Sequence, residues 1–187
     1  MPAPVKISRE AILAAGLELA RSRGLEGLNA RALAKALGCS TQPIFKNYPS
    51  MEALRRAVLE RVLAEYHRFM DDSAAASPYP VYKARGMAYI TFARAEPTLF
   101  RLLFMRDRKA EPDSPEDPDW PKDTALAGAS AGLGAAESEL FHLEMWAVVH
   151  GIAVMLATGY LKLDEATVSR MLTDAFQGIK TRWEERQ

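Results

Sequence analysis

Residues 37–50, LGCSTQPIFKNYPS, gather side chains whose chemistry suits contact with a nucleic acid. Gln42 carries a paired donor and acceptor that can match the edge of an adenine, and Thr41 beside it offers a hydroxyl and a methyl group. One helical turn further on, the ammonium of Lys46 and the hydroxyl of Tyr48 suit phosphate oxygens. The types and spacing of these residues favour a surface that contacts DNA.

Two short helices joined by a tight turn would present these side chains. The sequence ARALAKAL follows Asn29, a good N-cap, and stops at Gly38. After the turn at residues 38–40, Ser40 can cap the next helix, and Pro43 would take its third position, where the missing N–H has no intrahelical partner to lose. The proline ring also suits a thymine methyl. This order matches the helix-turn-helix plan, in which the second helix enters a major groove.

The remainder of the chain also predicts helices. Ser8 can cap a first helix that ends at Gly24, and no run of alternating β-branched residues indicates a strand, so we expect an all-α fold. The pattern leaves the Ala/Gly tract at residues 124–136 unassigned. Further helices are predicted over residues 51–70, from 81 to about 95, over 98–106, over 139–161 and from 164 to about 185.

The charge distribution separates a basic head from an acidic body. The 187 residues have a formal net charge of zero. Up to Arg61, however, ten Lys and Arg stand against five Asp and Glu, and beyond it fourteen stand against nineteen. This asymmetry indicates a polyanionic partner for the first third of the chain.

The stretch from about Ser8 to Arg55 resembles the N-terminal DNA-binding domain of the TetR family of transcriptional regulators. The match rests on Gly24, Asn29, Arg31, Leu33, Ala34, Gly38, Ser40, Phe45, Tyr48 and Ser50. The resemblance implies a cytoplasmic homodimeric regulator, a repressor in the commonest case, that binds a palindromic double-stranded operator and leaves it when a small molecule binds. It also implies a DNA-binding domain over residues 1–50 and an effector-binding and dimerisation domain over 51–187. The DNA-contacting residues are then Asn29, Arg31, Ser40, Thr41, Gln42, Pro43, Phe45, Lys46 and Tyr48.

Three departures from the family pattern involve four positions. Phe45 and Tyr48 stand where the family usually has tyrosine and phenylalanine, so the phenolic hydroxyl is displaced by three residues. Met51 replaces a lysine that often touches phosphate, which shifts the expected backbone contacts toward Lys46, Arg31 and Lys6. Asn29 replaces a common threonine and caps equally well. A helical dimer that has lost DNA binding is therefore an alternative function.

The last two predicted helices are apolar enough to require a partner surface. The resemblance implies that they pair with their counterparts in a second copy. The expected dimer-interface residues are Phe141, Met145, Val148, Ile152, Met155, Met171, Leu172, Phe176, Ile179 and Trp183.

Trp146, His150 and Gly151 form a W-x-x-x-H-G pattern that resembles the WHG-type C-terminal domain of some TetR-like regulators. Trp146 and His150 share one helical face, and Gly151 would permit close helix approach. Two interpretations stay open: the aromatic residues are packed core, or they line a pocket for a small apolar or aromatic effector. The pocket would consist of Tyr89, Phe92, Phe100, Phe104, Trp120, Trp146 and His150.

Other chemistries have little support. The single cysteine, Cys39, permits no intrachain disulfide and suits a small core position in a cytoplasmic protein. No metal-ligand spacing joins the three histidines, so we expect no metal and no cofactor. The G-x-S-x-G sequence around Ser130 matches a hydrolase nucleophile elbow, but that motif needs a preceding strand, so we expect no enzyme. The apolar segment 145–161 is too short and too interrupted for a membrane span.

Overall fold

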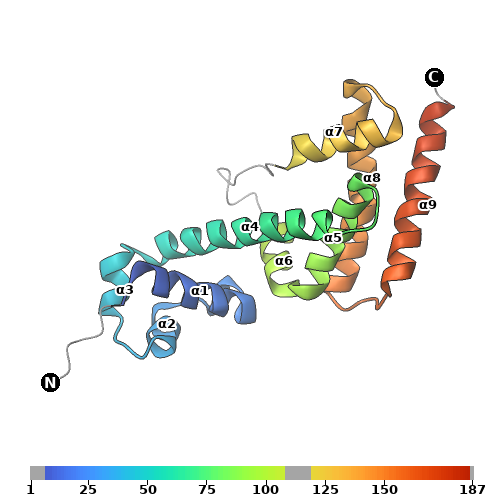
Figure 1. The fold of residues 1–187 in the computed structure, drawn as a ribbon. Helices are drawn as coiled ribbons and strands as arrows, with labels where there is room; N and C mark the ends of the chain where they lie inside the picture. Colours follow the sequence, from blue (N-terminus) through green and yellow to red (C-terminus); the bar gives the residue numbers. More distant parts are fainter. Residues whose placement is uncertain (1–6, 108–118, 186–187) are drawn as a thin grey trace. The chain divides into compact units, whose positions relative to one another are not determined.

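The computed structural model describes residues 7–107 and 119–185, which form helices joined by turns (Figure 1). No strand occurs in these ranges, so the all-α prediction is confirmed. The helices are α1 (Arg9–Arg23), the 3-10 turn η1 (Leu25–Gly27), α2 (Ala30–Ala36), α3 (Gln42–Asn47), α4 (Met51–Ala75), α5 (Val81–Ala95), α6 (Pro97–Phe104), α7 (Trp120–Ala131), α8 (Ala135–Ala157) and α9 (Glu165–Glu184).

The described residues form two compact units. The first contains residues 7–67 and 98–106, and the second contains residues 68–97, 107 and 119–185. The helix α4 contributes its longer first part to the first unit and its last turns to the second. These units are defined by which residues pack together. The predicted boundary at residue 50 separates a DNA-binding domain from an effector-binding and dimerisation domain, and it stays a prediction.

Local capping signals bound the helices of the first unit. The hydroxyl of Ser8 accepts a hydrogen bond from the Ala11 N–H at 3.1 Å, and the side chain of Asn29 accepts one from the Ala32 N–H at 3.0 Å, as predicted. Gly24 ends α1 with a φ of 69°, a value that favours glycine. A third cap, which the sequence reasoning did not name, is the bond from the Ala53 N–H to the Ser50 hydroxyl at the start of α4.

The first unit packs α1, α2, α3 and α4 around one apolar core. α1 and α4 approach each other closely at Gly16, where an added Cβ would lie 2.9 Å from a methyl group of Val58. The α6 helix joins this unit through Phe104, whose ring lies 5.1 Å from that of Tyr66. The fully buried aliphatic side chains of the first unit are Ile12, Leu28, Leu33, Ile44, Leu54, Val58, Val62 and Leu99.

The second unit is organised around α8, which packs on α5, α7 and α9. α7 approaches α8 so closely at Gly128 that a Cβ there would collide with the hydroxyl of Ser138. Gly86 of α5 is also closely packed: an added Cβ there would lie 3.3 Å from a methyl group of Leu172 on α9 and 3.4 Å from one of Val149 on α8. The unassigned Ala/Gly tract thus forms most of α7, a turn at Gly132 with φ 77°, and the beginning of α8.

Among the described helices, α8 is long and apolar enough, by length and composition alone, to cross a membrane. One such helix is weak evidence of a membrane span, because the central helix of a folded domain has the same composition. The packing of α8 on three neighbouring helices accounts for its apolar character.

Candidate functional site

The predicted reading helix exists, but it begins one residue later than expected. α3 covers Gln42–Asn47, and Thr41, not Ser40, occupies its N-cap position without a side-chain capping bond. The connection from α2 therefore runs from Leu37 to Thr41, and Gly38 adopts the positive φ of 63° that the turn requires. Pro43 takes the second helical position, where a backbone N–H would have no partner within the helix, so the proline costs no hydrogen bond.

Most of the predicted DNA-contacting side chains lie at the surface of the first unit. Gln42 and Lys46 are exposed on α3, and Arg31 is exposed on α2. Phe45 is also exposed, to 46%, which is unusual for a phenylalanine on a short helix. The geometry therefore leaves the predicted base-reading and phosphate-binding side chains accessible on two consecutive helices.

The structure corrects the role predicted for Tyr48. Its side chain is only 2% exposed, and its hydroxyl has neither accessible surface nor a hydrogen-bond partner among the described residues. A phosphate cannot reach that hydroxyl in this conformation. The ring instead makes a cation–π contact with the guanidinium of Arg9, whose central carbon lies 4.6 Å from the ring centroid.

Four of the ten predicted dimer-interface residues lie in the core of a single chain, which corrects their assignment, and the other six stay a prediction. Phe141, Met145, Ile152 and Leu172 are each at most 4% exposed. Phe176, Ile179 and Trp183 are half-buried against the same core, and Trp183 donates a hydrogen bond to Glu144 at 3.1 Å. The remaining three, Val148, Met155 and Met171, are half-buried. The apolar stripes face their own chain because α8 and α9 cover α5 and α7.

Four of the predicted effector residues do come together in the second unit. The Tyr89 hydroxyl lies 2.8 Å from Nδ1 of His150, and the His150 ring stacks on Trp146 at 4.6 Å. The Trp146 ring meets Trp120 edge-on at 6.1 Å. His142 and Tyr82, which were not predicted, extend this series: Trp120 contacts His142, and the Tyr82 hydroxyl lies 2.9 Å from Nδ1 of His142. We call the six residues Tyr89, His150, Trp146, Trp120, His142 and Tyr82 the aromatic ladder.

The other three predicted effector residues pack elsewhere. Phe92 is buried against Phe69, with ring centroids 5.4 Å apart. Phe100 and Phe104 belong to the first unit and contact each other at 5.2 Å. A pocket formed by all seven residues stays a prediction, and four of the seven meet in the aromatic ladder.

A buried arginine lies beside this ladder and holds three acidic side chains. Arg85 of α5 is 4% exposed and contacts Asp71 at 3.2 Å, Asp119 at 2.5 Å and, through Nε, Asp123. Lys122 adds a second cation at 3.0 Å from Asp71. Since Asp71 lies on α4 and the other two carboxylates lie at the start of α7, Arg85 ties three helices together.

Burial and this charge cluster set the protonation states of the ladder. Burial, with the Arg85 guanidinium second, lowers the pKa of His142 to about 4. Burial also lowers the pKa of His150. Burial, followed by the charge of Asp123, raises the pKa of Tyr82. Burial alone would lower the pKa of Arg85, but its contacts with Asp123 and Asp119 raise it overall. Both histidines are therefore neutral at pH 7.

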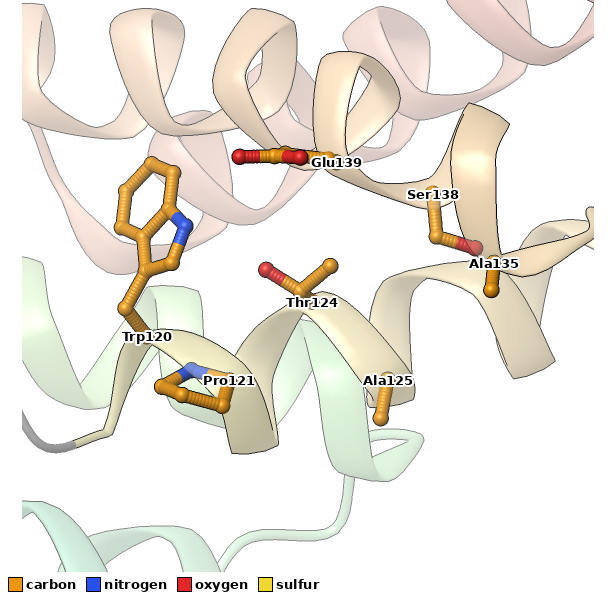
Figure 2. A pocket seen from close by; sticks show the side chains of 7 residues that line it. All are labelled: Trp120, Pro121, Thr124, Ala125, Ala135, Ser138 and Glu139. Atoms are coloured by element: carbon orange, nitrogen blue, oxygen red, sulfur yellow. The ribbon is translucent and has the colours of Figure 1, made fainter.

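An open hollow of about 380 Å³ lies between α7 and the start of α8 (Figure 2). The Trp120 indole bounds it on one side, and Glu139 lies across from Thr124. The Thr124 hydroxyl has no accessible surface and no hydrogen-bond partner among the described residues. The lining residues are Trp120, Pro121, Thr124, Ala125, Ala135, Ser138 and Glu139.

The missed residues left a recognisable signal in the sequence. Tyr82, Arg85 and Tyr89 lie three and four residues apart and so share one face of α5, which is otherwise apolar. The seven-residue spacing of the tyrosines nearly equals the eight-residue spacing of His142 and His150 on α8. Once α5 is known to face α8, these matched spacings of two turns account for both tyrosine–histidine pairs.

Other predicted features take positions that restrict their roles. Ser130 lies inside α7, where the strand-to-helix turn of a nucleophile elbow does not exist. A Cβ on Gly151 would meet nothing within 4 Å, so this glycine provides no close helix approach within one chain. Among the described residues, no group of three or more His, Cys, Asp or Glu could hold a metal ion. Lys6, an expected phosphate contact, lies outside the described residues.

Comparison with known proteins finds matches over both halves of the chain. Residues 12–58 match the model of bacterial regulatory proteins of the tetR family, and residues 82–176 match the tetracyclin repressor-like C-terminal domain. An HTH-type transcriptional regulator of Mycobacterium tuberculosis is 28% identical over 91% of this chain and 79% of its own length. The class D tetracycline repressor of Escherichia coli is 27% identical over 55% of this chain and 42% of its own length. A TetR-like transcriptional regulator from a Rhodococcus species shares the fold, with a TM-score of 0.66 at 15% identity over 96% of this chain and 97% of that one.

Proposed function

Because the chain belongs to the TetR family of bacterial regulatory proteins, we propose that it is a cytoplasmic DNA-binding transcriptional repressor that a small molecule releases from its operator. The observation that carries this proposal is the helix-turn-helix of α2 and α3, with Gln42, Lys46 and Arg31 exposed. The WHG-type assignment of the C-terminal domain stays a prediction.

The chemistry of α3 divides its residues between reading and holding DNA. Gln42 occupies the first helical position, and Thr41 stands at the cap before it. In the helix-turn-helix geometry this end of the second helix faces the base edges, so Gln42 and Thr41 would read sequence. The cations Lys46 and Arg31 would bind phosphates and supply affinity without sequence preference.

A homodimer would place two such heads on successive turns of a palindrome. The face of α8 that its own chain leaves uncovered supports a dimer, because Leu140 and Leu143 are 45% and 46% exposed. Ala147 and Gly151 continue this face at four-residue intervals and are small enough to allow close approach of a second helix. This outward face would take the place of the four predicted interface residues that are buried.

The hollow beside Trp120 is the proposed effector site. Its walls combine an indole face with the aliphatic side chains of Pro121, Ala125 and Ala135, which suits a small aromatic or apolar molecule. Trp120 is also part of the aromatic ladder, so a ligand on its ring would act on the packing between α5 and α8.

The ion pairs of Arg85 give an effector a route to α4. Asp119 and Asp123 flank Trp120 on α7, and both contact Arg85, which also holds Asp71 near the end of α4. A ligand that shifts the first turn of α7 would therefore change the ion pairs at α4, the helix that directly follows the reading head in the chain. Such coupling needs only that the ligand favour one of two arrangements.

DNA binding is tested with the segment immediately upstream of the gene that encodes this chain. Fluorescence anisotropy across salt concentrations should show specific binding that weakens as salt increases. Gln42→Ala should lose about 1–3 kcal/mol of discrimination against other sequences, whereas Lys46→Ala should weaken binding to all sequences alike. Equal effects of the two substitutions on discrimination would contradict the assigned roles, and binding that ignores salt would contradict DNA binding by this surface.

The effector site is tested by filling the hollow. Ala125→Trp should remove the thermal stabilisation that a small aromatic probe such as indole gives to the wild type. The matched control is Ala129→Trp, which adds the same bulk to an exposed position one turn further along α7 and outside the hollow. Equal responses of both variants to indole would place the ligand elsewhere.

A further inference from the structure

The contact between Arg9 and Tyr48 connects the first residue of α1 with the residue that follows α3. The central carbon of the Arg9 guanidinium lies 4.6 Å from the centre of the Tyr48 ring, and Tyr48 is only 2% exposed. A cation at this distance from a ring face is attracted by the negative charge of the π system. The stack holds the guanidinium at the end of the reading helix while Arg9 as a whole stays exposed.

Arg9 differs from Arg21 and Arg61 of the first unit in its partners. Arg21 contacts Glu18 and Glu65, and Arg61 contacts Glu10 and Glu65. In the described part of the chain, by contrast, no carboxylate lies within ion-pair distance of Arg9. Its five N–H donors are thus available to an external anion, and a planar guanidinium suits the oxygens of a phosphate.

The two aromatic residues near the end of α3 cannot make this phosphate contact themselves. Phe45 is exposed but carries no hydrogen-bonding group, and the hydroxyl of Tyr48 is enclosed. A backbone phosphate that approaches this end of the helix would therefore find a cation and not a phenol.

We propose that Arg9 binds a phosphate of the DNA backbone and that Tyr48 is the positioning residue that holds its guanidinium ready for that contact. The proposal rests on the proposed function, because it assigns an additional contact to the same DNA-binding surface. It adds a residue from outside the helix-turn-helix to that surface, and it gives the displaced tyrosine a role that does not use its hydroxyl.

The test measures binding to a 40-base-pair duplex of mixed sequence, because a phosphate contact does not depend on the operator. Each phosphate contact contributes about 0.9 to the slope of log affinity against log salt, so Arg9→Ala should reduce the slope of a dimer by about 1.8. Between 50 and 200 mM salt, the wild type should then lose about tenfold more affinity than the variant does. Arg9→Lys keeps the charge and should restore most of the slope.

The matched control is Arg23→Ala. Arg23 is also exposed, but it lies fourteen residues further along α1, about 21 Å from Arg9, so its removal should leave the slope unchanged. Tyr48→Phe keeps the ring and should bind like the wild type, whereas Tyr48→Leu should weaken binding. Melting curves of all variants show whether each one is folded.

The outcomes separate this proposal from the proposed function. If the wild type binds the duplex and Arg9→Ala keeps the wild-type slope, the phosphate contact is refuted while DNA binding stands. If Tyr48→Leu is folded and binds like the wild type, the positioning role of Tyr48 is refuted. A wild type that fails to bind duplex DNA at 50 mM salt would instead contradict the proposed function itself.

Discussion

Replacing Tyr48 by phenylalanine should stabilise the protein without weakening its binding to DNA. The substitution deletes one oxygen atom and leaves the ring that supports Arg9. The sequence alone suggested the opposite result, because it assigned the Tyr48 hydroxyl to a phosphate. The variant therefore distinguishes between the two descriptions of the residue.

The magnitude follows from the surroundings of the hydroxyl. It is enclosed and lacks a hydrogen-bond partner among the described residues. A buried polar group in that condition costs about 1–3 kcal/mol. Deleting the oxygen leaves a small gap, whose cost is on the order of 0.5 kcal/mol. The free energy of unfolding should then rise by about 1 kcal/mol, and the Tm of a chain of this size by about 2–4 °C.

The assay compares thermal and urea denaturation of the two proteins. Tyr89→Phe is the matched control, because it deletes the same atom from a hydroxyl that lies 2.8 Å from His150 Nδ1. That deletion breaks a buried hydrogen bond and should lower the stability by about 1–2 kcal/mol. If Tyr48→Phe destabilises the protein as much as Tyr89→Phe does, the Tyr48 hydroxyl has a partner and the reasoning fails.

Three further substitutions probe the second unit. Arg85→Leu leaves Asp119 and Asp123 without their buried counterion and should cost about 3–5 kcal/mol of stability in urea denaturation; a loss below 1 kcal/mol would show that the cluster is not held by charge. The pKa of His142 is lowered to about 4 in the folded chain, from its ordinary 6.5. As the pH falls, the imidazole therefore takes up a proton in the unfolded chain before it does so in the folded one. The free energy of unfolding should then decrease as the pH falls from 6.5 toward 4. Between pH 7 and pH 5 the wild type should lose about 2 kcal/mol more than His142→Gln does, and parallel stability curves would contradict the neutral state of this imidazole. Ala147→Glu should convert the dimer to a folded monomer in light scattering, because it adds a charge to the outward face of α8; an unchanged mass would move the interface elsewhere.

The reading head was predictable because its signals are local. Ser8 and Asn29 cap their helices through N–H groups three residues away, and Gly38 provides the positive φ of the turn. The one-residue error at α3 has a physical cause. With Thr41 as the N-cap, Pro43 moves from the third to the second helical position, nearer to the helix start that suits its fixed φ.

The burial of Tyr48 was also accessible to sequence reasoning. Ile44 and Tyr48 lie four residues apart, so they share a face of the chain, and both are buried. Phe45 lies on the neighbouring face and is exposed. The chemistry of the side chain drew attention to the hydroxyl, whereas helical periodicity would have placed the ring inside.

The second unit was less predictable because its site depends on which helices pack together. Tyr82, Arg85 and Tyr89 become a polar face only when α5 meets the two histidines of α8. Nothing local to α5 selects that neighbour. The carboxylates of Asp119 and Asp123 are still less predictable, since they follow a segment whose course the sequence pattern did not assign.

The α8 helix shows why a hydrophobic stripe cannot by itself identify a dimer interface. Phe141, Met145 and Ile152 form one apolar face, and Leu143 and Ala147 form another. An amphipathic helix has one apolar face, which its own chain covers, but a helix that is apolar on two faces needs two partners. In α8 the side chains of Phe141 and Met145 lie in the chain's own core, where they pack against Ala127 and Ala131 of α7. The face left over carries the smaller residues Ala147 and Gly151, which is the composition that lets a second helix approach closely. The proposed interface is therefore better sought at the exposed positions Leu140, Leu143 and Ala147 than along the buried stripe.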